Sequence, residues 1–65
     1  MKQQLISALK SHAEGHIHKH LMNVEVLLQN PVGTAGSVDI MQSLEDELLE
    51  VAKYHDVLEM IEVYR

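Results

Sequence analysis

The chain has 65 residues, a formal net charge of −5 and no cysteine, so it is expected to form one small domain, residues 1–65, without disulfides or thiolate metal sites. Residues 1–30 carry three Lys and two acids (net +1), and residues 37–65 carry one Lys, one Arg and eight acids (net −6). This acidic second half, a single Arg and the lack of Phe and Trp argue against nucleic-acid binding.

The first predicted element is a long helix. Apolar residues recur at steps of three and four between Leu5 and Leu28, which is the pattern of one helical face. This pattern predicts a helix over about residues 3–29. Asn30 suits a helix C-terminus and Pro31 prevents the helix from continuing, so we expect a loop over residues 30–37.

The second predicted element is a helix over about residues 38–64, begun by Ser37 or Asp39 as the capping residue. Its expected inward face is spaced like a coiled-coil stripe and comprises Ile40, Met41, Leu44, Leu48, Val51, His55 and Leu58. Combined with the first helix, this face predicts a core built from Ile17, Val24, Leu44, Leu48, Val51 and Leu58.

A second apolar face is expected near the C-terminus, turned away from the inward face. It contains Val57, Met60, Ile61 and Tyr64. Because a helix that is apolar on two sides usually buries both, we predict that these four residues form an interface with another chain. The expected partner is a second copy, and the alternative is a different protein.

The predicted fold is all-α. A connection this short permits only an antiparallel two-helix hairpin, and such a hairpin leaves much apolar surface in water. We therefore expect the chain to homodimerise into a four-helix bundle, with a tetramer as the alternative. No stretch approaches the roughly 18 consecutive apolar residues of a membrane span, and no secretory pattern is recognisable, so a cytoplasmic location is expected.

Five histidines in 65 residues raise the question of a metal site. His12 and His16 are spaced to clamp one cation from a single helix, and the antiparallel register brings His55 near them. Zinc or iron is the corresponding cofactor. In the alternative interpretation no cofactor is bound, and His20 and His55 are interior residues whose rings bond a carboxylate, a carbonyl or water.

No catalytic or cofactor-binding residue is predicted. The serines lack a recognisable nucleophile motif, and the glycines are spaced like a turn rather than a phosphate cradle. The predicted function is that of a small, non-enzymatic structural or protein-interaction module that works through helical self-association. The competing hypothesis is a histidine-rich metal-binding bundle, which includes the option of a metalloenzyme.

Several short runs also carry a family resemblance. They are residues 11–17 (Ser-His-Ala-Glu-Gly-His-Ile), 22–26 (Met-Asn-Val-Glu-Val), 30–33 (Asn-Pro-Val-Gly), 39–41 (Asp-Ile-Met), 52–54 (Ala-Lys-Tyr) and 58–60 (Leu-Glu-Met). Together they resemble small uncharacterised proteins of tailed phages that infect marine cyanobacteria. The resemblance implies an accessory protein in the cytoplasm of an infected host cell, where the alternative partner is a host or phage protein, and it implies no functional residue.

Overall fold

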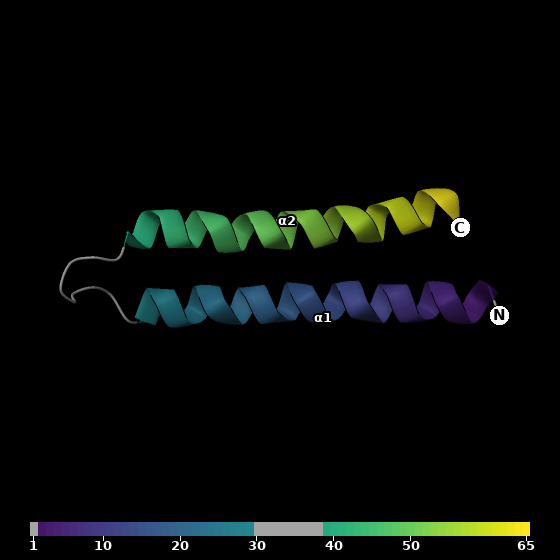
Figure 1. Cartoon of the computed structure of the whole chain (residues 1–65), viewed down its shortest axis with the longest axis horizontal. Helices are drawn as coiled ribbons and strands as arrows, with labels where there is room; N and C mark the ends of the chain where they lie inside the picture. Colours follow the sequence, from purple (N-terminus) through teal and green to yellow (C-terminus); the bar gives the residue numbers. More distant parts are fainter. Residues whose placement is uncertain (1, 30–38) are drawn as a thin grey trace.

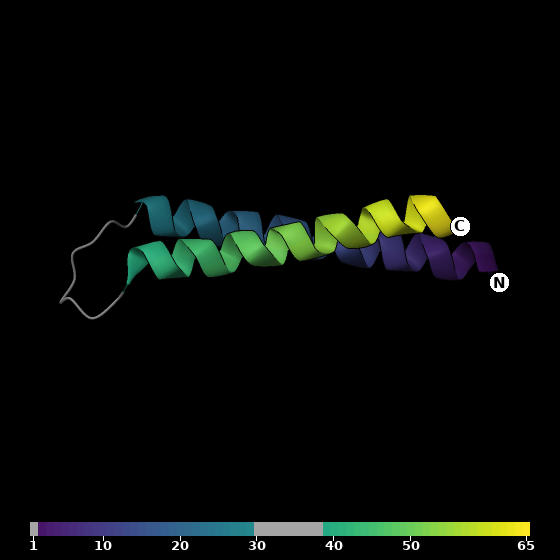
Figure 2. The same ribbon diagram turned by 90° about the horizontal axis from the view of Figure 1, so that it is seen from above.

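The computed structural model describes residues 2–29 and 39–65, and these form two helices, α1 (Lys2–Gln29) and α2 (Ile40–Tyr64). The helices run antiparallel and lie side by side along their length, so both termini are at the same end (Figures 1 and 2). The described part of the molecule is therefore an all-helical hairpin. The loop expected at residues 30–37, with Asn30, Pro31 and Ser37, lies outside the described residues.

The start of α2 follows from a local side-chain contact. Asp39 has extended backbone angles, φ −87° and ψ 95°, and its Oδ1 accepts a hydrogen bond of 3.0 Å from the backbone N–H of Gln42. This bond satisfies one of the backbone donors that the first helical turn leaves free. The prediction that Asp39 can cap the second helix is confirmed. The Gln42 amide turns forward, to Asp46 and Glu45, rather than back to the cap.

The two helices meet along a strip that repeats every seven residues. We call this strip the seam, and its members are all buried or half-buried: Ile6, Ala13, His20 and Leu27 on α1, and Ile40, Glu47, Tyr54 and Ile61 on α2. A spacing of seven keeps one face of each helix toward the other over the whole length, as in a coiled coil. The half-buried residues Ile17, Val24, Leu44, Val51 and Leu58 lie beside it.

The predicted inward face of α2 is wrong at three positions. Met41 is 80% exposed and Leu48 is 50% exposed, and His55 is also exposed. Glu47 and Tyr54 lie on the seam where Leu48 and His55 were expected. At these levels the preceding residue, about 100° away around the helix, faces α1 instead, and Glu47 and Tyr54 have polar and aromatic partners there.

The hairpin buries little. Of the described residues only Ala13 and Ile61 are buried, and no large side chain is fully enclosed. The molecule measures 51 × 15 × 14 Å, so it is a rod whose cross-section is only one or two helices wide. Neither α1 nor α2 contains a stretch both long and apolar enough to span a bilayer.

Candidate functional site

The middle of the seam is polar. His20 Nδ1 lies 2.7 Å from Glu47 Oε1, and the Asn23 side-chain amide donates to the same oxygen at 3.0 Å. Because a carboxylate only accepts, the His20 Nδ1 must carry the proton in this bond. The His20 side chain is only 12% exposed and that of Glu47 25% exposed, so water competes weakly for both. This three-residue network ties the two helices together at one level.

Four rings pack on one side of this network, and we call them the ring cluster: His12, His16, His20 and Tyr54. His16 stacks on Tyr54 with ring centroids 4.2 Å apart and an interplanar angle of 7°. His12 meets His16 edge-on at 4.6 Å, and the His16 and His20 rings are 6.1 Å apart. The spacing of four residues on α1 places the three imidazoles one above the other, so that Tyr54 of α2 packs against the middle ring.

One polar atom of the ring cluster has no partner. His16 Nδ1 is buried and makes no hydrogen bond to another described residue. Burial lowers the pKa of His16 below its ordinary value of 6.5, and the neighbouring His12, Lys19, His20 and Lys53 lower it further by charge repulsion. His16 therefore resists protonation in the folded hairpin.

The Glu47 carboxylate beside the cluster is held in its charged form. The hydrogen bond from His20, with a second from Asn23, lowers the pKa of Glu47 below its ordinary value of 4.5. Lys53 Nζ lies 3.0 Å from Glu50 Oε1, and this hydrogen bond raises the pKa of Lys53. The Lys53 ammonium also lies 4.9 Å from the centroid of the Tyr54 ring, within cation–π range.

The residues predicted as metal ligands are only partly brought together. His12 and His16 are neighbours in the ring cluster, but the side chain that packs against them from α2 is Tyr54 and not His55. Within residues 2–29 and 39–65 no group of three or more His, Asp or Glu side chains is arranged to hold a metal ion. His20 does bond a carboxylate as expected, whereas the interior position expected for His55 is wrong.

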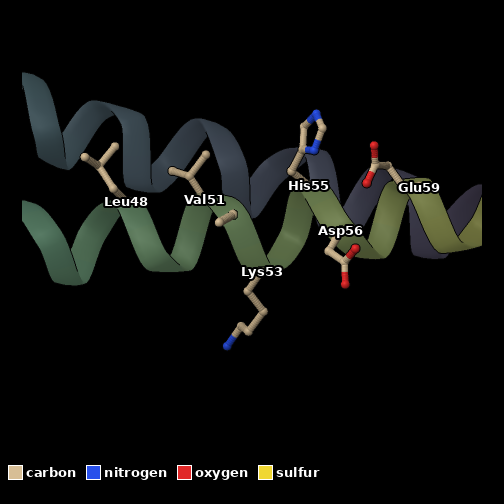
Figure 3. Close-up of a pocket in the computed structure, with 7 residues that line it drawn as sticks. Leu48, Val51, Lys53, His55, Asp56 and Glu59 are labelled. Atoms are coloured by element: carbon tan, nitrogen blue, oxygen red, sulfur yellow. The ribbon is translucent and has the colours of Figure 1, made fainter.

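His55 lies instead at a shallow hollow of about 600 Å³ on the outside of α2. Figure 3 shows His55 on the same side of the helix as Leu48, Val51 and Glu59, while Lys53 and Asp56 point the other way. Leu48 and His55 each follow a seam residue directly in sequence. This side of α2 is therefore the flank opposite to the one where Lys53 covers Tyr54.

The four residues predicted as an interface line one groove near the termini, of about 350 Å³. Val57, Met60, Ile61 and Tyr64 form one wall, and Ile6 and Leu9 of α1 form the other. Ile61 is only 7% exposed and belongs to the seam, whereas Tyr64 is 81% exposed. The structure thus differs from the expectation that all four face away from α1.

Sequence reasoning missed Glu47, Asn23 and Tyr54. For Glu47 and Tyr54 the signal is the repeat of seven that links Ile40, Glu47, Tyr54 and Ile61, which matches the repeat of seven on α1. Chemically, the seam and the ring cluster hold three imidazoles, one phenol ring and the Glu47 carboxylate between the two helices. Comparison with known proteins adds no assignment, because no protein-family model, curated protein or solved structure matches the chain.

Proposed function

We propose that this chain is a small, non-enzymatic protein-interaction module that acts through self-association of its helical hairpin into a four-helix bundle. The observation that carries the proposal is that few residues are buried while many large apolar side chains are exposed to water. Among residues 2–29 and 39–65, only Ala13 and Ile61 are buried, while twelve large apolar side chains are exposed by 40% or more. A second copy is the most economical cover for such a surface, because isolated hairpins of this size have too small a core to be stable.

Charge also supports a homotypic assembly. Helix α1 carries three Lys and two Glu, and α2 carries one Lys and seven acids, so their net charges are +1 and −6. Packing α1 of one copy beside α2 of another brings unlike charges together. Exposed ion pairs contribute at most about 1 kcal/mol each, so charge selects the arrangement and apolar burial drives it. Following the resemblance to tailed-phage proteins, the setting that we propose for this module is the cytoplasm of an infected bacterium.

Sedimentation equilibrium over micromolar to millimolar concentrations tests the proposal, with far-UV circular dichroism on the same samples. We expect a particle of twice the chain mass of 7.4 kDa that dissociates on dilution, with loss of helix as it does so. A particle of 7.4 kDa that stays fully helical over the whole range would refute self-association as the function of this hairpin.

A further inference from the structure

The two flanks of the seam differ in chemistry. In an antiparallel pair of right-handed helices, the residues that directly follow the seam positions on both helices share one flank, and those that directly precede them share the other. His12 and Lys53 precede seam residues, and both contact Tyr54, as this rule requires. The opposite flank consists of the residues that follow: Ser7, Glu14, Leu21 and Leu28 on α1, and Met41, Leu48, His55 and Glu62 on α2.

One half of this opposite flank is entirely apolar. We call that half the leucine flank, and it consists of Leu21, Leu28, Met41 and Leu48, with exposures of 40%, 59%, 80% and 50%. Because His20 pairs with Glu47, the next residues Leu21 and Leu48 lie level with each other, and Leu28 and Met41 form the next level toward the connection. The half nearer the termini carries Glu14, His55 and Glu62 instead.

Two symmetric arrangements can cover this surface with a second copy. A two-fold axis parallel to the helices leaves the termini of both copies at the same end. It places the leucine flank of one copy against the leucine flank of the other. A two-fold axis perpendicular to the helices reverses the second copy, which lays the leucine flank against Glu14, His55 and Glu62. Apolar matching therefore favours the parallel axis.

Charge favours the same arrangement. The parallel axis places α1, with net charge +1, beside α2 of the second copy, with net charge −6. The perpendicular axis places α2 beside α2, so that two helices of net charge −6 repel each other. Lys10 lies on the α1 side of this flank and makes no ion pair within the described residues, so it is free to meet the acidic helix of a second copy.

We infer that the leucine flank of one copy contacts the leucine flank of a second copy of this chain, and that a two-fold axis parallel to the helices relates the two copies. This inference rests on the proposed self-association. Each α1 then packs beside α2 of the second copy, and every neighbouring pair of helices in the bundle is antiparallel. The ring cluster faces away from this contact, on the other flank of each hairpin.

Leu48→Glu tests the surface. Both copies of the dimer carry the substitution, and each places a carboxylate in an apolar contact, so we expect the dimer dissociation constant to rise on the order of a hundredfold. The matched control is Leu49→Glu, which changes the adjacent leucine, 60% exposed, on the outer side of α2. We expect the control to leave the dissociation constant within about threefold of the wild type.

Cross-linking tests the axis without relying on a destabilised variant. The chain has no cysteine, so Leu44→Cys provides one thiol per copy, on the part of α2 that turns toward the leucine flank. A short bis-maleimide should cross-link the two thiols of a dimer whose copies are related by the parallel axis. Reversal of one copy would separate the two thiols by on the order of 20 Å along the bundle. Leu49→Cys, on the outer side, is the control and should not cross-link.

The outcomes separate the two proposals. A folded wild-type monomer would remove both the proposed function and this surface. A dimer that tolerates Leu48→Glu but dissociates with Met60→Glu would keep self-association and move the interface to the groove near the termini. A dimer that is weakened by Leu48→Glu yet resists cross-linking at Leu44→Cys would overturn the parallel axis alone.

Discussion

Replacing Ile61 by Ala removes three carbons from a buried side chain at the contact between the two helices. At about 0.8 kcal/mol for each buried carbon, a side chain that is 7% exposed loses about 2 kcal/mol of transfer free energy. The site borders the groove shared with Ile6 and Leu9, which is open to water, so little closed cavity remains to add to this loss. We expect the free energy of unfolding of the variant to be about 2 kcal/mol lower than that of the wild type.

Val63→Ala is the matched control. Val63 lies two residues away on the same helix and is 63% exposed, and it is also β-branched, so both substitutions raise helix propensity by a similar amount. Urea unfolding followed at 222 nm, at one fixed chain concentration, measures both variants. We expect a change near zero for the control. Equal losses of stability in Ile61→Ala and Val63→Ala would show that Ile61 does not pack against α1 and would refute the seam.

Three further predictions concern α1 and the polar part of the seam. Gly15→Ala should stabilise the hairpin by about 1 kcal/mol in thermal unfolding, because a Cβ at Gly15 meets nothing within 4 Å; a loss would indicate a close neighbour there. Since the pKa of Glu47 is lowered in the folded state, its contribution to the free energy of unfolding is present above pH 4.5 and is lost as the pH falls through its folded pKa. The free energy of unfolding of Glu47→Gln should therefore fall less steeply on acidification than that of the wild type. Because the pKa of His16 is also lowered, stability should decline as the pH falls below 6.5, and an NMR titration should find His16 titrating below that value.

The sequence alone was sufficient for the local elements. Apolar steps of three and four predicted helices over about 3–29 and 38–64, and the described helices are Lys2–Gln29 and Ile40–Tyr64. The Asp39 cap depends on contacts within one turn, and so does the edge-on contact of His12 with His16, which are four residues apart. Such contacts are readable from sequence because the residues that make them are close along the chain.

Only the tertiary structure decided which face of α2 turns inward. Leucines at 44, 48 and 58 made Leu48 look like a core residue, but the structure places Glu47 and Tyr54 on the seam and leaves Leu48 50% exposed. Two neighbouring stripes of one helix have similar apolar content, so hydrophobicity along that helix cannot choose between them. The choice depends on the other helix, where His20 and Asn23 bind the Glu47 carboxylate and His16 stacks on Tyr54. These partners are more than twenty residues away in sequence, and only the folded hairpin brings them together.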